Sequence, residues 1–231
     1  MKIKRFTGDA TDPNLKRRVL IIDDHLVVRQ GLKHLIDRED DLLTCGDVAD
    51  ARKGLDAIHG LNPDVVLVDI SLPGMNGIEF IKNAKASHPD LPIVVFSMHD
   101  ESLYAERAIR AGALGYVMKK ADSEEMIAAL RKALRGEIHT SSIIGGTLLH
   151  RLLGRKRPEN GSSVSRLSDR ELEVFEMIGH GKTSREIAGT LKLSIKTVDT
   201  HRMHVKEKLG LRTAIELVQH AVHHVENEVE H

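Results

Sequence analysis

The sequence predicts an α/β fold with a doubly wound parallel sheet, followed by a second, all-helical domain. Short apolar runs alternate with amphipathic segments from residue 18 to about residue 136, as in successive strand–helix repeats. Two of these runs, residues 19–22 and 65–68, are unbroken, which is typical of strands buried on both faces of a parallel sheet. Beyond residue 165 the apolar runs give way to helix-capping patterns.

Five strands and five helices are expected to alternate in the first domain. The strands are expected near residues 18–24, 42–48, 64–70, 92–97 and 114–119. The helices are expected near residues 26–38, 51–59, 76–87, 102–111 and 123–135. Pro63 and Pro92 precede strands, while Gly112 and Gly136 follow helices, which agrees with these boundaries.

Four helices are expected in the second domain, near residues 168–181, 183–192, 195–209 and 213–224. Ser168 and Thr183 are each followed three residues later by Glu, which is the pattern of a capping box, and Ser194 is a further N-cap. Because only the short turn at residues 192–194 joins the second and third helices, the pair indicates a helix-turn-helix.

The remaining residues are interpreted as a tail and a linker. Residues 1–17 are polar and aperiodic, which predicts a flexible tail. Residues 137–165 include the hydrophilic run GRKRPENGSS and are typical of a flexible linker, although residues 143–153 are compatible with a short amphipathic helix. The predicted domains are therefore residues 18–136 and 166–231.

The composition excludes several other classes of protein. The single cysteine, Cys45, rules out a disulfide framework and fits a reducing cytoplasm; it is interpreted as a small buried hydrophobe or, alternatively, a reactive thiol. Neither a signal peptide nor an apolar run of transmembrane length is visible, so we expect a cytoplasmic protein with no membrane partner. The 14 histidines lack metal-ligand spacing, and His220, His223 and His224 are interpreted as a polar helix tail.

The charge distribution indicates a polyanion partner for one segment. Lys and Arg together equal Asp and Glu over the whole chain, which gives a formal net charge of +0. Residues 182–212 nevertheless carry 8 basic against 3 acidic side chains, a local balance of +5. This window covers the predicted helix-turn-helix, and a basic patch there is typical of a surface that binds nucleic acid.

Three carboxylates stand where two predicted strands end. Asp23 and Asp24 follow one strand and Asp69 follows the other. Because ligands of such sheets lie at the carboxyl ends of the strands, we expect the three negative charges to lie close together and to need a cation. Clustered oxygens of this kind suit Mg²⁺, which keeps several waters and takes few protein carboxylates.

Two further polar side chains turn the predicted metal site into a phosphoryl-transfer site. Ser97 and Lys119 follow the last two predicted strands. Phosphoryl transfer needs positioning and charge neutralisation, so in this interpretation Asp69 is the nucleophile that becomes an aspartyl phosphate. Mg²⁺ is held by the three carboxylates with the Ser71 backbone carbonyl as a further ligand. Lys119 and the Ser97 hydroxyl then stabilise the phosphoryl oxygens.

Four motifs carry a family resemblance: residues 22–25 (IDDH), 69–77 (DISLPGMNG), 96–99 (FSMH) and 115–119 (GYVMK). In order, spacing and residue type, they resemble a response-regulator receiver domain. The resemblance implies the flavodoxin-like strand order 2-1-3-4-5, a histidine kinase as phosphodonor, and switch roles for Ser97 and Tyr116. Without it, Tyr116 would be interpreted as a rim aromatic whose hydroxyl meets water. Phosphoryl uptake and self-dephosphorylation would be autocatalytic, so no enzyme is expected.

The second domain resembles the LuxR-type helix-turn-helix domain of NarL/FixJ-type regulators. The matching stretches are residues 167–174 (LSDRELEV), 181–188 (GKTSREIA), 193–201 (LSIKTVDTH) and 206–211 (KEKLGL). The resemblance implies that the helix beginning at Ile195 is the recognition helix. Helical spacing predicts that Ile195, Val198, Val205 and Leu209 form its buried face.

The other face of the recognition helix supplies the expected DNA contacts. Its N-terminal part enters the major groove, so Asp199, Thr200 and Met203 are candidates for base contacts. The remaining candidates, which include the expected phosphate contacts, are Lys182, Lys196, Thr197, Arg202, Lys206 and Lys208. Two roles stay open: Asp199 either accepts a hydrogen bond from cytosine or orients Arg202 or Lys196, and Met203 either packs internally or contacts a thymine methyl.

The leading interpretation is a transcription regulator gated by phosphorylation. Its expected partners are a histidine kinase, double-stranded DNA, a second copy of the chain when phosphorylated, and RNA polymerase as a further candidate. One alternative is a protein-interaction module whose helical domain dimerises, against which the basic window argues. A metal-dependent phosphatase is another, but no substrate-pocket residues beyond the receiver set are visible.

Overall fold

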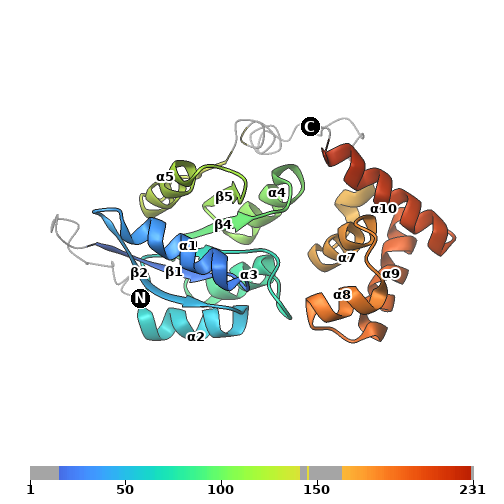
Figure 1. Ribbon diagram of the computed structural model, residues 1–231, viewed down its shortest axis with the longest axis horizontal. Coiled ribbons are helices and arrows are strands. Elements are labelled where there is room, and N and C mark those ends of the chain that lie inside the picture. Colours follow the sequence, from blue (N-terminus) through green and yellow to red (C-terminus); the bar gives the residue numbers. More distant parts are fainter. Residues whose placement is uncertain (1–15, 141–144, 146–162, 230–231) are drawn as a thin grey trace, which may run out of the picture.

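The N-terminal domain is built on a five-stranded parallel sheet in the order β2-β1-β3-β4-β5 (Figure 1). The computed structural model describes residues 16–140, 145 and 163–229. The strands are β1 (Arg17–Ile22), β2 (Leu42–Val48), β3 (Val65–Val68), β4 (Ile93–Ser97) and β5 (Gly115–Met118). The helices between and after them are α1 (Leu26–Asp37), α2 (Ala51–Leu61), α3 (Gly77–Ser87), α4 (Glu101–Ala111) and α5 (Ser123–Leu134). The predicted fold class, strand order and order of elements are confirmed.

Alternation along the strands gives the sheet two apolar faces. In β1, Val19 and Ile21 point towards α1 and α5, whereas Leu20 and Ile22 point towards α2, α3 and α4. All four side chains are fully buried. Three strands end earlier than predicted, because the polar residues at their carboxyl ends lie in loops beyond the last ladder position.

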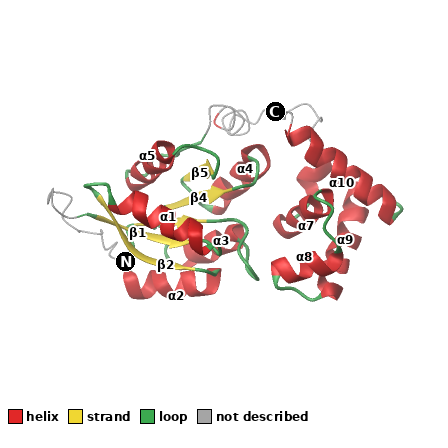
Figure 2. Ribbon diagram, in the orientation of Figure 1, coloured by secondary structure: helices red, strands yellow, loops and turns green. Residues whose placement is uncertain are grey.

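The C-terminal domain contains helices and turns throughout its described residues, 163–229 (Figure 2). Its elements are the 3-10 helix η1 (Ser163–Arg166), α7 (Asp169–Gly179), α8 (Ser184–Leu191), α9 (Ile195–Leu209) and α10 (Ala214–Val229). Both predicted capping boxes are present, at Ser168 and at Thr183, and Ser194 caps α9. Lys192 adopts a left-handed conformation (φ 51°) that ends α8 and forms the turn to α9.

The buried face of α9 is shorter than predicted. Val198 and Val205 are fully buried, but Ile195 is 44% exposed and Leu209 is only half-buried. The prediction that Ile195 is buried is therefore wrong. Helical spacing identifies which face of a helix is apolar, but it does not say how far neighbouring helices extend along that face.

Both ends of the predicted linker are attached to the domains. The backbone N–H of Tyr116 donates to the carbonyl of His139 at 3.0 Å, which extends the sheet edge at β5. At the other end of the linker, Val164 is buried in the apolar cluster. The predicted helix at residues 143–153 lies outside the described residues apart from residue 145, and the predicted tail lies outside them up to residue 15. In the described part of the chain, no helix combines the length and the hydropathy that a membrane span requires.

Gly77 allows α3 to pack directly beneath the Asp69 loop, and its substitution should destabilise the fold. A Cβ at Gly77 would collide with the Asp69 carbonyl and with Ile70, whereas a Cβ at Gly31, within α1, would meet nothing within 4 Å. We expect Gly77→Ala to lower the free energy of unfolding by about 1–3 kcal/mol, because the backbone must shift. Gly31→Ala should raise it by about 0.5–1 kcal/mol. Urea denaturation measures both, and equal stability of the two variants would contradict this packing.

Candidate functional site

The three predicted carboxylates meet at the carboxyl edge of the sheet. Asp23 and Asp24 follow β1 and Asp69 follows the neighbouring strand β3. One ligand atom from each, together with one from His25, lies within 4.8 Å of all the others. Asp23 and Asp69 are only 2% and 3% exposed, so little water offsets their charges. This placement requires a compensating cation.

Lys119 supplies one positive charge to this cluster. Its Nζ lies 2.6 Å from Asp23 Oδ2 and 2.7 Å from Asp69 Oδ2, which joins two loops of the sheet edge. Burial alone would lower the pKa of Lys119, but the facing carboxylates of Asp69 and Asp23 outweigh it and hold the pKa above its ordinary value. The ammonium therefore stays charged in the site.

The cluster still has oxygens suited to a metal ion. Asp69 Oδ1 is buried and has no hydrogen-bond partner among the described residues. Burial raises the pKa of Asp24, and the charges of Asp23 and Asp69 raise it further against the opposing effect of His25. Carboxylate oxygens that repel one another at a partly exposed edge are the donors that Mg²⁺ prefers, so the residues fit this ion.

The two predicted switch residues both contact His99. Ser97 is fully buried, and its Oγ accepts a hydrogen bond from the His99 backbone N–H at 3.3 Å. Tyr116 is 1% exposed, and its hydroxyl donates to the His99 carbonyl at 2.9 Å. The interpretation of Tyr116 as a rim aromatic in water is therefore wrong. Burial raises the pKa of Tyr116 well above its ordinary value, which keeps the hydroxyl protonated.

His99 was not predicted as a site residue. Its Nε2 lies 2.7 Å from Ser71 Oγ, so its ring reaches the loop that carries Asp69. His99 is the last residue of the FSMH motif, but neither its type nor its position distinguishes it from a loop residue in the sequence. Its importance depends on contacts with residues far away in the chain, which local patterns do not encode.

The predicted recognition helix, α9, presents a polar face to solvent. Lys196, Asp199 and Thr200 are exposed, and Met203 is 48% exposed. Met203 is therefore not an internal packing residue. Of the other basic candidates, Lys182 is exposed just before α8, while Arg202 and Lys206 are partly exposed on α9.

Several predicted DNA contacts already have partners within the domain. Asp199 accepts a hydrogen bond from Ser184 Oγ at 2.8 Å, which joins α9 to the first residue of α8. Ser194 Oγ lies 2.7 Å from Thr197 Oγ1 as part of the α9 cap. The first contact fixes α9 to α8, and in the described part of the chain no hydrogen bond or ion pair joins Asp199 to Lys196 or Arg202.

Two further candidates also have partners within the domain. Thr200 Oγ1 donates to the Lys196 carbonyl at 2.9 Å, one turn earlier in the same helix. Lys208 Nζ lies 2.6 Å from Glu171 Oε2 of α7. The carboxylate neutralises Lys208, so this residue is a poorer candidate for a phosphate contact than Lys196 or Arg202.

Comparison with known families agrees with this geometry. The response regulator receiver domain family matches residues 19–131, and the luxR family of bacterial regulatory proteins matches residues 165–221. The oxygen regulatory protein NreC of Staphylococcus aureus is 31% identical over 209 residues, which are 89% of this chain and 96% of that protein. This chain belongs to the response regulators that join a receiver domain to a LuxR-type helix-turn-helix domain.

Solved structures of response regulators match part or most of this chain. A LuxR-family two-component response regulator from Aurantimonas sp. SI85-9A1 is 32% identical, with a TM-score of 0.55, and covers 60% of this chain and 99% of its own. RcsB from Salmonella enterica serovar Typhimurium, bound to the rprA promoter in the presence of the phosphomimetic BeF3-, is 26% identical. Its TM-score is 0.61, and the match covers 90% of this chain and 98% of RcsB.

Removing the charge of Asp24 should stabilise the metal-free receiver and abolish its response to Mg²⁺. Because the folded-state pKa of Asp24 is raised, the stability linked to its protonation is lost as the pH rises through that pKa. At pH 7.5 the ionised carboxylate therefore opposes folding, and Asp24→Asn should raise the free energy of unfolding in EDTA by up to about 1 kcal/mol.

Addition of Mg²⁺ should then stabilise the wild type but not Asp24→Asn, because a ligand that binds only the folded state raises its stability. Urea denaturation with EDTA or Mg²⁺ measures both effects. Asp40→Asn removes an exposed carboxylate from the α1–β2 loop and serves as the control. Equal stabilisation of both variants by Mg²⁺ would contradict a role for Asp24 in binding the metal.

Proposed function

We propose that this response regulator accepts a phosphoryl group on Asp69 from a histidine kinase and that phosphorylation controls its binding to double-stranded DNA. The observation that carries the proposal is the buried Asp69 carboxylate, of which one oxygen is bound by Lys119 and the other has no partner among the described residues. The helical domain of the same chain would provide the DNA-binding activity that phosphorylation controls.

The residues of the cluster fit a bound Mg²⁺ ion. Asp23, Asp24 and Asp69 would hold it through their carboxylates, with the Ser71 backbone carbonyl as a further ligand. When bound, the ion supplies positive charge that offsets the charge on the phosphoryl oxygens. The high negative charge of the cluster and the unpartnered oxygen of Asp69 support this assignment.

The protein's own side chains have distinct roles in the transfer. A carboxylate oxygen of Asp69 attacks the phosphorus of the kinase phosphohistidine; the O–P bond forms, the P–N bond breaks, and the kinase imidazole leaves. Lys119 offsets the charge of the phosphoryl group, and Ser97 donates a hydrogen bond to one of its oxygens. Water later hydrolyses the acyl phosphate and restores Asp69, so the chain modifies itself and turns over no separate substrate.

The exposed face of α9 is the proposed DNA-reading surface. Thr200 and Met203 are assigned to the base edges, and Lys182, Lys196, Arg202 and Lys206 to phosphates. Asp199 and Thr197 are assigned to fixing the helix-turn-helix through Ser184 and Ser194. RcsB, a structural relative, has been solved bound to a promoter, which supports the same use of this domain here.

The proposed partners follow from this assignment. Two copies of the chain would bind paired half-sites as a dimer formed on phosphorylation, because modules of this type use two-fold binding. RNA polymerase is the proposed target of the bound dimer. We place this action in the cytoplasm, where a bacterial regulator of the luxR family meets chromosomal DNA.

Phosphorylation should strengthen DNA binding only when Asp69 is intact. We expect treatment with a small phosphodonor and Mg²⁺ to tighten binding of the wild type to a selected DNA fragment by about 5–150-fold. Asp69→Asn should show neither phosphoryl uptake nor tightening, because an amide is a poor nucleophile. Fluorescence anisotropy measures affinity, and intact-mass spectrometry measures phosphorylation. An equal response of Asp69→Asn would contradict the proposal.

Lys196 should contribute one phosphate contact. Each contact of this kind releases a counterion, so Lys196→Ala should weaken binding to all DNA sequences alike and reduce the slope of log K against log salt by about 1. Lys53→Ala, which removes an exposed lysine from the receiver, should leave the slope unchanged. An unchanged slope in Lys196→Ala would remove this residue from the interface.

A further inference from the structure

The receiver and the DNA-binding domain are joined by a buried carboxylate on α7. Glu176 is 5% exposed, and two receiver side chains contact its Oε2 atom. The Tyr104 hydroxyl of α4 donates to this oxygen at 2.9 Å, and His99 Nδ1 lies 2.7 Å from it. The apolar cluster of α2, α3 and α4 continues around this contact into the DNA-binding domain.

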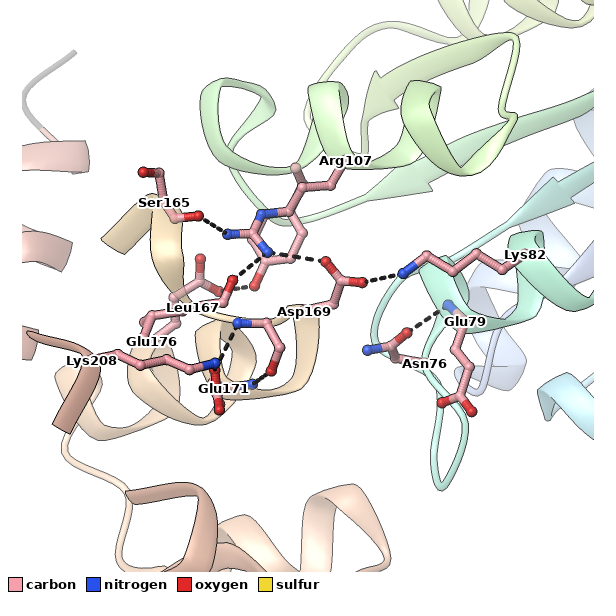
Figure 3. Close-up of polar contacts among 12 residues, drawn as sticks. Asn76, Glu79, Lys82, Arg107, Ser165, Leu167, Asp169, Glu171, Glu176 and Lys208 are labelled. Atoms are coloured by element: carbon pink, nitrogen blue, oxygen red, sulfur yellow. Dashed lines mark hydrogen bonds and ion pairs between the residues drawn. The ribbon is translucent and has the colours of Figure 1, made fainter. Parts of the chain in front are cut away.

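Other contacts surround this centre. Arg107 of α4 donates to the Leu167 carbonyl at 2.7 Å and to Asp169 at 3.0 Å, while Lys82 of α3 binds the other oxygen of Asp169 at 2.9 Å (Figure 3). The Gly74 backbone N–H donates to the Leu191 carbonyl at 3.0 Å. These contacts hold the domains together, but none of them uses a side chain assigned to phosphoryl transfer.

His99 differs from these contacts because it also touches both switch residues. Its backbone N–H donates to Ser97 Oγ, its carbonyl accepts from the Tyr116 hydroxyl, and its Nε2 contacts Ser71 Oγ. The remaining ring nitrogen contacts Glu176. A single residue therefore connects both switch residues and the Asp69 loop to the DNA-binding domain.

We propose that His99 is the positioning residue that couples phosphorylation to domain release. This inference rests on the proposed function, and it names the route by which the phosphoryl group controls the DNA-binding domain. In the unphosphorylated protein, Ser97, Ser71 and Tyr116 hold the His99 ring against Glu176, and the paired carboxylate keeps α7 on the receiver.

Phosphorylation of Asp69 changes the contacts that hold His99 on the receiver side. Ser97 turns its hydroxyl towards a phosphoryl oxygen, so the His99 backbone N–H loses its acceptor and the Tyr116 hydroxyl moves with the loop. A shift of the ring by about 1 Å ends the hydrogen bond to Glu176. The Glu176 carboxylate then keeps only Tyr104 as a receiver partner. A buried negative charge that has lost its partner is strongly unfavourable. The domains therefore separate, and water hydrates Glu176 again.

The test uses two substitutions that each weaken one contact of the same Glu176 oxygen. Glu176→Gln keeps an acceptor for Tyr104 but removes the charge that attracts His99. Tyr104→Phe removes the other hydrogen bond and keeps the pair with His99. For both variants and the wild type, DNA affinity is measured by anisotropy with and without BeF3⁻ and Mg²⁺, and the radius of gyration is measured by X-ray scattering.

Glu176→Gln should bind DNA at least about fivefold more tightly than the wild type without BeF3⁻, should be more expanded, and should gain less than about twofold on its addition. Tyr104→Phe should also bind DNA more tightly than the wild type without BeF3⁻. On addition of BeF3⁻, however, its DNA affinity should rise by the same factor as that of the wild type. A wild-type response in Glu176→Gln, or an equal loss of response in Tyr104→Phe, would overturn the assignment.

A double variant tests the pair without any phosphodonor. His99→Ala should add less than about twofold to the basal DNA affinity of Glu176→Gln, because both substitutions remove the same contact. Additive effects would overturn the proposal. If the wild type itself fails to respond to BeF3⁻, the proposed function fails; if the wild type responds and Glu176→Gln responds equally, only the role of His99 fails.

Discussion

The ammonium of Lys119 between Asp23 and Asp69 is the interaction on which the rest of the site depends. Two carboxylates that are only 2% and 3% exposed repel each other strongly unless a cation stands between them. The parallel sheet makes this contact available, because the loops after β1, β3 and β5 all emerge at one edge. The same crowding leaves one buried Asp69 oxygen without a hydrogen-bond partner in the described part of the chain, and the metal binding and phosphoryl transfer proposed above both depend on this oxygen.

The sequence was sufficient to predict the features that depend on local patterns of residues. Unbroken apolar runs identified the strands, capping boxes identified the helices, and the polar residues that follow the strands had to meet once the sheet was parallel. Contacts between distant parts of the chain could not be predicted. His99 and Glu176 are 77 positions apart in the numbering, and Ser184 gives no sign that it binds Asp199. The exposure of Ile195 likewise depends on where neighbouring helices end.

The contact between the domains includes several polar side chains. Glu173 and Glu176 of α7 are buried, and burial raises the pKa of Glu173 even though Arg170 binds it at 2.6 Å. Such groups would regain hydration in the proposed separation of the domains, which would make that separation less costly than the opening of an apolar interface. Lys196, Thr200 and Met203 are exposed while the domains are packed, so packing restricts the position of the DNA-binding domain and does not cover these side chains.

In the proposed function, the phosphorylation site and the DNA-binding surface share one equilibrium. Reciprocal binding tests it most directly: if BeF3⁻ tightens DNA binding by some factor, DNA must tighten BeF3⁻ binding by the same factor. The measurement is a calorimetric titration of BeF3⁻, at fixed Mg²⁺, into the full chain with and without a saturating concentration of a selected DNA fragment. DNA should raise the BeF3⁻ affinity by the factor seen in the opposite experiment. A BeF3⁻ affinity that is the same with and without DNA would contradict it.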